Sequence, residues 1–157
     1  MTVKLASSPE ESPAPVVESL ARAMSETSIE TAKAQTYHWN VTGMAFGPLH
    51  DLFQQIYEDH FEAQDTLAER IKALGAHVDG RLQARLETST IDECDGRLSA
   101  RAMVKTLAAD QKTLSETLLY LARVAEEHGD DVTNDMAIER AHLHDKFAWI
   151  LNAHLSE

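Results

Sequence analysis

The stretch PLHDLFQQIYEDHFEAQDTLAERIKALG, residues 48–75, decides the fold. It opens on a proline and closes on a glycine, and no residue between them breaks helices. Its apolar side chains recur at steps of three and four residues, which is the period of one face of an α-helix. The sequence therefore predicts an amphipathic helix over residues 48–74, with His60 as a hydrogen-bonded residue of its core face. That core face comprises Phe53, Ile56, His60, Ala63, Leu67, Ile71 and Leu74.

Prolines and glycines divide the rest of the chain into further long segments. The other three prolines all lie within the first 15 residues, and no proline follows Pro48. Because glycine commonly ends helices, the glycines mark the expected helix ends. The chain should consist of a flexible tail over residues 1–14 and one domain over residues 15–157. Helices are predicted over residues 15–41, 48–74 and 98–128, and from about 130 to 155, with a short helix around 81–87.

The connections between these helices define the architecture. The first and second helices, and likewise the third and fourth, are joined by short turns, so each pair should be antiparallel. The connection from the second to the third helix has about 22 residues, which is long enough to cross the bundle from end to end. One long crossover is the ferritin-like arrangement. The expected fold is therefore all-α, a ferritin-like four-helix bundle whose crossover contains the short helix.

Composition limits the partners and the location of the chain. Its formal net charge is −12, and an acidic surface repels nucleic acid and anionic membranes while it attracts cations. Plain solubility explains such a charge equally well. No apolar run approaches the length of a membrane span, and the N-terminus lacks the apolar region of a signal peptide. With Cys94 as its one cysteine, the chain is expected in a reducing cytoplasm.

An acidic ridge follows the outer face of the 48–74 helix. On a helical wheel its carboxylates lie opposite the apolar face, and His50 and Gln54 lie between the two. Carboxylates and imidazoles are suitable ligands for iron and similar metals. A solvated helix face is the alternative explanation of such a charge run. The ridge comprises Asp51, Glu58, Glu62, Asp65 and Glu69.

Distance restricts any metal site that uses this ridge. His50 and Asp65 are fifteen residues apart on one helix, which places them about 22 Å apart. They cannot bind the same metal ion within one chain. Two copies of the helix related by a two-fold axis would bring the His50 end of one to the Asp65 end of the other, and would create two equivalent sites. Ligands on this face therefore predict a dimer interface.

The residues that carry this pattern resemble the signature of the Dps family, the mini-ferritins. The match comprises YHWNVTG at residues 37–43, then Phe46 and His50, and DTLAER at residues 65–70. The separations of 12, 15 and 4 residues along His38, His50, Asp65 and Glu69 are similar to the spacing in that family. DKFAW at residues 145–149 is similar to the last helix of the family. The resemblance covers about residues 16–155.

This resemblance implies a hollow shell of twelve subunits, built from two-fold dimers, that oxidises Fe(II) and stores the ferric mineral. Its ferroxidase centres would lie between subunits, with His38 and His50 from one chain and Asp65 and Glu69 from the other. Hydrogen peroxide is the typical oxidant of the family, and some members use oxygen. Consumption of peroxide with Fe(II) would protect the cell from oxidative damage. Iron is the expected metal, and no organic cofactor is expected.

The resemblance also suggests roles for other residues. Asp51, Glu58 and Glu62 would line the cavity and nucleate mineral. Trp39, beside His38, would either pack in the core, which is the simpler interpretation, or intercept oxidising equivalents. Asp130, Asp131 and Asp135 would line pores through which iron enters, or would cap the last helix and complement its dipole.

Gln54 departs from the family pattern, in which many members have an aspartate at this position. Glutamine is a neutral and weaker oxygen ligand, so the second iron position should be weaker or held through water. The departure therefore bears on metal affinity at the second position and leaves the first metal position unaffected.

Two other functions compete with ferroxidase activity. Direct DNA binding, as in relatives with lysine-rich tails, is disfavoured because twelve copies at −12 would carry about −144. A redox-silent helical bundle that only binds metal is the second alternative. The observation in its favour is Gln54, which stands where many family members have an aspartate.

Overall fold

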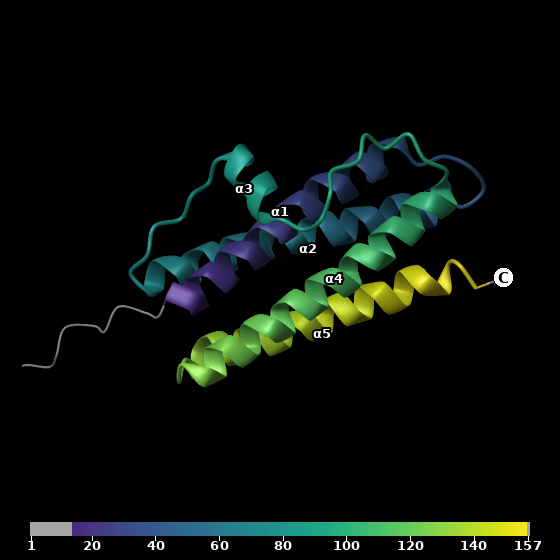
Figure 1. Cartoon of the computed structure of the whole chain (residues 1–157). Helices are drawn as coiled ribbons and strands as arrows, with labels where there is room; N and C mark the ends of the chain where they lie inside the picture. The colour runs from purple at the N-terminus through teal and green to yellow at the C-terminus, as the bar shows by residue number, and fades with distance from the viewer. Residues whose placement is uncertain (1–13, 157) are drawn as a thin grey trace, which may run out of the picture.

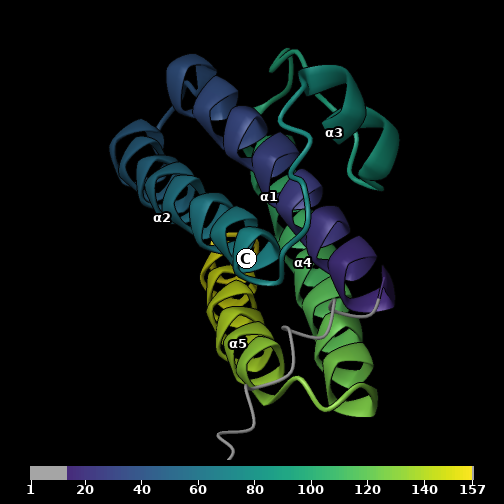
Figure 2. The ribbon, with the colours of Figure 1, turned by 90° about the vertical axis from the view of Figure 1, so that its left-hand side faces the viewer.

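The computed structural model describes residues 14–156, and in this range its regular secondary structure consists of helices, without strands. Figure 1 shows two helical hairpins packed side by side, and Figure 2 shows that the segment between them runs outside the bundle along α1. The all-α bundle with one long crossover is therefore confirmed. The predicted tail lies outside the described residues, apart from Ala14, which opens α1. The helices are α1 (Ala14–Asn40), α2 (Phe46–Ala73), α3 (Leu82–Thr88), α4 (Ala100–Glu127) and α5 (Asp131–Ala153).

The second helix begins two residues earlier than its proline suggested. The N–H of Phe46 bonds the carbonyl of Gly43 at 3.1 Å, so helical turns start before Pro48. Pro48 falls in the first turn, where backbone N–H groups have no partner within the helix, and a proline there costs no hydrogen bond. Gly43 itself has a φ of 103°, a conformation that permits the sharp reversal between α1 and α2.

The crossover lies against α1 through polar contacts. Arg85 of α3 donates to the Ser28 hydroxyl at 2.6 Å, and the buried carboxylate of Glu26 accepts from the Thr90 hydroxyl at 2.7 Å. At Gly96, which has a φ of 78°, the backbone approaches so closely that an added Cβ would lie 2.8 Å from Thr36. These contacts explain how a long connection with little buried apolar surface keeps one position.

The core has two large apolar halves separated by a polar layer, and a small third cluster of Ile29, Ile91 and Leu114. One half surrounds Leu20, Leu118 and Leu121, and the other surrounds Phe53 and Leu107. Each of the four long helices contributes a buried polar residue to the layer between them. These residues are Glu30 of α1, His60 of α2, Gln111 of α4 and His144 of α5, and none of them is exposed.

None of the helices in the described part of the chain combines the length and the apolar content that a membrane span requires.

Candidate metal centre

Two histidines face each other where α1 ends and α2 begins. Nδ1 of His38 lies 2.9 Å from the carbonyl oxygen of His50, and Nδ1 of His50 lies 2.9 Å from the carbonyl oxygen of His38. Their rings stack with centroids 3.7 Å apart and planes 20° apart. A carbonyl oxygen only accepts hydrogen bonds, so each Nδ1 carries a proton and Nε2 is the nitrogen that faces away from these bonds. A histidine that binds a metal through one ring nitrogen is oriented by the hydrogen bond that the other nitrogen makes.

Aromatic side chains hold this histidine pair on both sides. The Phe46 ring stacks on His50 with centroids 5.0 Å apart, and the Tyr57 ring meets His38 edge to face at 5.3 Å. Tyr57 was not predicted as part of the site, although it lies seven residues after His50 and therefore on the same face of α2. The packing restricts ring rotation, so the two Nε2 atoms are held before any metal arrives.

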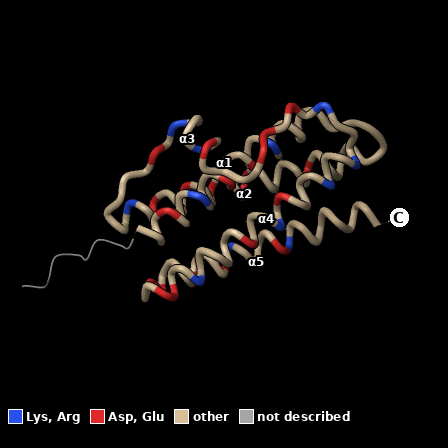
Figure 3. Tube along the Cα trace, viewed as in Figure 1, with Lys and Arg blue, Asp and Glu red and all other residues tan. Residues whose placement is uncertain are grey.

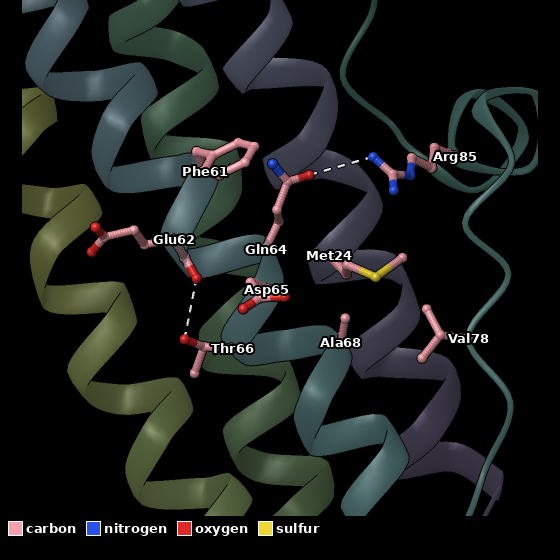
Figure 4. Close-up of a pocket in the computed structure, with 9 residues that line it drawn as sticks. All are labelled: Met24, Phe61, Glu62, Gln64, Asp65, Thr66, Ala68, Val78 and Arg85. Atoms are coloured by element: carbon pink, nitrogen blue, oxygen red, sulfur yellow. Dashed lines mark hydrogen bonds between the residues drawn. The ribbon is translucent and has the colours of Figure 1, made fainter.

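The two carboxylates lie further along α2 and are exposed. Asp65 and Glu69 are four residues apart, which places them one turn from each other on the same face. Figure 4 shows Asp65 in a hollow between α2, α1 and the crossover, close to Glu62 and Gln64. Arg85 closes one side of this hollow and donates to the Gln64 side chain at 3.4 Å. Asp65 in this hollow and the exposed Glu69 one turn further are both open to a ligand or to another chain.

The structure does not bring the histidines and the carboxylates together within one chain. Both pairs belong to the unbroken helix α2 and its junction with α1, and fifteen residues between His50 and Asp65 correspond to about 22 Å. Among residues 14–156, no three His, Cys, Asp or Glu side chains are grouped closely enough to hold a metal ion. The chain therefore presents two separate half-sites.

The other ridge residues lie where the helical wheel placed them. Asp51, Glu58 and Glu62 are exposed, and Gln54 is half-buried one turn after His50. The Gln54 amide nitrogen donates to a carboxylate oxygen of Glu58 at 2.7 Å. The amide oxygen of Gln54 therefore remains available as an uncharged metal ligand.

Trp39 does not pack in the core. Its side chain is 66% exposed in the last turn of α1, so the simpler interpretation of this residue was wrong for the single chain. The two preceding residues, Tyr37 and His38, are buried. Successive helical residues point about 100° apart, and a residue that follows two inward positions turns toward solvent.

The three aspartates near the start of α5 have different surroundings. Asp130 is the N-cap residue of α5, where its carboxylate accepts from the Thr133 N–H at 3.0 Å and pairs with Arg70 at 2.6 Å. Burial raises the pKa of this carboxyl, but the bonds from Thr133 and the charge of Arg70 outweigh that effect and lower the pKa. Asp131 and Asp135 are exposed. Figure 3 shows acidic residues gathered near this turn between α4 and α5.

Comparisons with known proteins agree with this geometry. The family model described as "Ferritin-like domain" matches residues 17–157. The "DNA protection during starvation protein" of Brevibacillus brevis is 39% identical over 125 residues, which cover 78% of this chain and 83% of that protein. The crystal structure of Dps from Staphylococcus aureus superposes with a TM-score of 0.90 at 32% identity, covering 94% of this chain and 99% of that one. A Dps structure from Vibrio cholerae, described as a member of the ferritin-like diiron-carboxylate proteins, gives a TM-score of 0.87 at 27% identity, covering 90% and 89%.

Proposed function

Because this chain belongs to the Dps family of ferritin-like proteins, we propose that it oxidises Fe(II) with hydrogen peroxide at centres shared by two subunits, and stores the ferric product inside a shell of twelve. The single observation that carries the proposal is the pair of half-sites on α2. The histidine pair lies at the start of the helix, and Asp65 and Glu69 lie about 22 Å further along it. A two-fold axis across α2 would bring the histidine pair of each chain to the carboxylate pair of the other chain, and would so form two complete sites per dimer.

The ligand set suits iron that changes its oxidation state. The Nε2 atoms of His38 and His50 would be nitrogen ligands, and the carboxylates of Asp65 and Glu69 would supply the negative charge that favours Fe(III) over Fe(II). Two Fe(II) ions give up one electron each, and one hydrogen peroxide takes up both electrons and two protons to form two waters. This stoichiometry needs no other reductant, and it removes the two reactants whose encounter elsewhere produces hydroxyl radicals.

Gln54 would weaken the second iron position in this centre. Its amide oxygen is neutral, and its amide nitrogen is engaged by Glu58. A carboxylate at this position would add a negative charge beside His50, and the amide does not. We expect one iron to be held tightly by the four principal ligands and the second to be held more loosely.

Other exposed residues would serve the transport and storage of iron. Asp51, Glu58 and Glu62 would nucleate mineral, and Asp131 and Asp135 would attract Fe(II) at pores between subunits. Asp130 would contribute less, because Arg70 neutralises it. Trp39 is exposed beside His38, where its indole ring would intercept oxidising equivalents by giving up an electron.

The first test follows ferric absorbance after the anaerobic, Fe(II)-loaded protein receives peroxide. The wild type should oxidise iron rapidly and keep the product in solution, whereas Asp65→Ala/Glu69→Ala should oxidise it slowly with precipitation. Glu116→Ala/Glu127→Ala, which removes two exposed carboxylates from α4, is the matched control and should behave as the wild type. Equal, slow oxidation in all three proteins would contradict the proposal and favour a redox-silent metal-binding bundle.

A mixing experiment tests whether two chains share the centre. Chains with His38→Ala/His50→Ala are unfolded, mixed in equal amounts with Asp65→Ala/Glu69→Ala chains and reassembled. Random pairing makes half of the dimers mixed, and each mixed dimer regains one of its two complete sites. About one quarter of the wild-type rate should return, although neither parent is active. A mixture as inactive as its parents would show that the ligands do not come from two chains.

A further inference from the structure

The polar layer in the middle of the bundle has no part in the metal centre, and its hydrogen bonds form a closed ring. Nε of Arg140 donates to Nε2 of His144 at 3.1 Å, and Nδ1 of His144 lies 2.7 Å from the amide oxygen of Gln111. The amide nitrogen of Gln111 lies 2.9 Å from Nε2 of His60, and Nδ1 of His60 lies 3.1 Å from Asp59. The two outer nitrogens of Arg140 donate to the Asp59 carboxylate and close the ring.

Only one arrangement of protons satisfies this ring. The guanidinium of Arg140 is always a donor, so Nε2 of His144 accepts and its Nδ1 donates to the oxygen of Gln111. The Gln111 nitrogen then donates both of its protons, one to His60 and one to Glu30 at 3.0 Å. The remaining proton of His60 lies on Nδ1, which donates to Asp59. Both imidazoles must therefore be neutral.

An added proton on His144 would place two donors against each other. The new N–H at Nε2 would point at the Nε–H of Arg140, and a positive imidazolium would lie 3.1 Å from a positive guanidinium. His144 is fully buried, so no water can take the place of the lost contact. Burial and the neighbouring His60 and Arg140 lower the pKa of His144, and Asp59 opposes that effect only in part.

The other groups that face the ring do not provide an acceptor for this proton. From α1, Glu30 bonds the nitrogen side of the Gln111 amide, and Lys33 pairs with Asp110 of α4 at 2.6 Å. From α5, the Phe147 ring meets His60 edge to face at 5.7 Å. The carboxyl groups of Glu30 and Asp110 thus lie beyond the amide, and Asp59 is already bonded by Arg140 and His60.

We propose that this ring is an acid-sensitive latch that holds α5 against α2. Arg140 and Asp59 join the two helices directly, and His144 keeps Arg140 in place only while its own Nε2 is unprotonated. In acid, His144 takes up a proton, loses the bond from Arg140, and α5 separates from α2. The inference is independent of the metal chemistry, because none of the ring residues belongs to either half-site.

The test is hydrogen exchange of the α5 backbone in the assembled protein, read by mass spectrometry at about pH 7.5 and about pH 5 and corrected for the intrinsic pH dependence of exchange. In the open state His144 would have the ordinary histidine pKa of about 6.5, whereas in the closed state it stays unprotonated. Proton binding to the open state alone therefore raises the opening equilibrium constant about 30-fold between pH 7.5 and pH 5. The wild type should show an increase of about this size in the opening of α5. His144→Gln, whose amide oxygen can accept from Arg140 but does not titrate, should reduce the increase by about 30-fold.

The control is His142→Gln, the same substitution at an exposed position two residues away on α5, and it should keep the wild-type pH dependence. The same pH dependence in His144→Gln and His142→Gln would overturn the proposal. Should His144→Gln not fold, Arg140→Lys replaces it, since lysine keeps a cation for Asp59 but lacks the Nε–H aimed at His144. In that variant a proton on His144 meets no opposing N–H, so the increase in α5 opening between pH 7.5 and pH 5 should be smaller than in the wild type, and an unchanged increase would equally overturn the latch.

Discussion

Replacement of Glu30 by glutamine should make the protein more stable at alkaline pH, although it removes a buried charged residue. The Glu30 side chain is fully buried, one of its oxygens accepts from Gln111 at 3.0 Å, and the other has no hydrogen-bond partner. Burial, together with the charge of Asp110, raises the pKa of this carboxyl well above 4.5, and Lys33 offsets that only in part. The folded protein therefore holds a proton on Glu30 that the unfolded chain has released.

The sign and the size of the effect follow from this difference in bound protons. A raised pKa in the folded state contributes stability below the unfolded value of 4.5 and loses it as the pH rises toward the folded value. In that window one proton per chain corresponds to about 1.4 kcal/mol of unfolding free energy for each pH unit. For a chain of this size, that is a difference in melting temperature of about 3–6 °C per pH unit. Glutamine at position 30 keeps an acceptor for Gln111 and has no proton to lose.

Thermal unfolding of the wild type and Glu30→Gln, followed by circular dichroism from pH 5 to pH 8, is the assay. The melting temperature of the variant should exceed that of the wild type by a margin that grows with pH. Glu26→Gln is the matched control, since Glu26 is equally buried in α1 but accepts from Arg22 and Thr90. It should be destabilised by about 1–2 kcal/mol, because charge-assisted bonds become neutral ones. Melting curves of the wild type and Glu30→Gln that stay parallel over this range would refute the reasoning.

Further substitutions test the fold in the same unfolding assay. Gly96→Ala should destabilise the protein by about 1–3 kcal/mol, because the new Cβ would lie 2.8 Å from Thr36 at a positive φ. Gly47→Ala, where no atom lies within 4 Å of the new Cβ, is the control and should leave the stability unchanged. Tyr37→Phe should leave stability unchanged or raise it by up to about 1 kcal/mol, because the Tyr37 hydroxyl is buried without a hydrogen bond; a clear loss would reveal a partner for this hydroxyl. Asp130→Ala should cost about 1–2 kcal/mol through the lost cap and the lost pair with Arg70, and no loss would mean that Asp130 serves the pore alone.

The helices could be predicted because their signals are local. The period of the apolar residues in 48–74 and the glycines at the helix ends depend only on neighbours in sequence, and the ends agree with the structure to within two residues. The start of α2 at Phe46 was missed because a proline is compatible with any place in the first turn. The exposure of Trp39 was missed because an aromatic residue beside a buried histidine is consistent with either face.

The candidate metal centre was accessible to sequence reasoning for a similar reason. Both candidate half-sites lie on α2 or at its junction with α1, so helix geometry alone separates His50 from Asp65, and one metal ion could bind both residues only if a second chain supplied one of them. The reciprocal bonds between His38 and His50 were not predictable, because they depend on the angle at which α1 and α2 meet. Sequence reasoning thus supplied the candidate ligands, and the structure added the hydrogen bonds that orient the two histidines.

The polar ring marks where sequence reasoning ended, since its members come from α2, α4 and α5 and have no common spacing. His60 could be recognised as a core residue from its position on the apolar face, but its partner Gln111 lies 51 residues away. A buried polar residue without its partners is destabilising, and the same residue within a complete ring costs little and fixes how the helices align. Two apolar core halves alone would tolerate a shift of α5 along α2, because leucine and alanine side chains repack. The ring accepts only one register of α5 against α2. The features that define the metal centre and those that align the bundle are therefore separate in sequence but meet on the same helix.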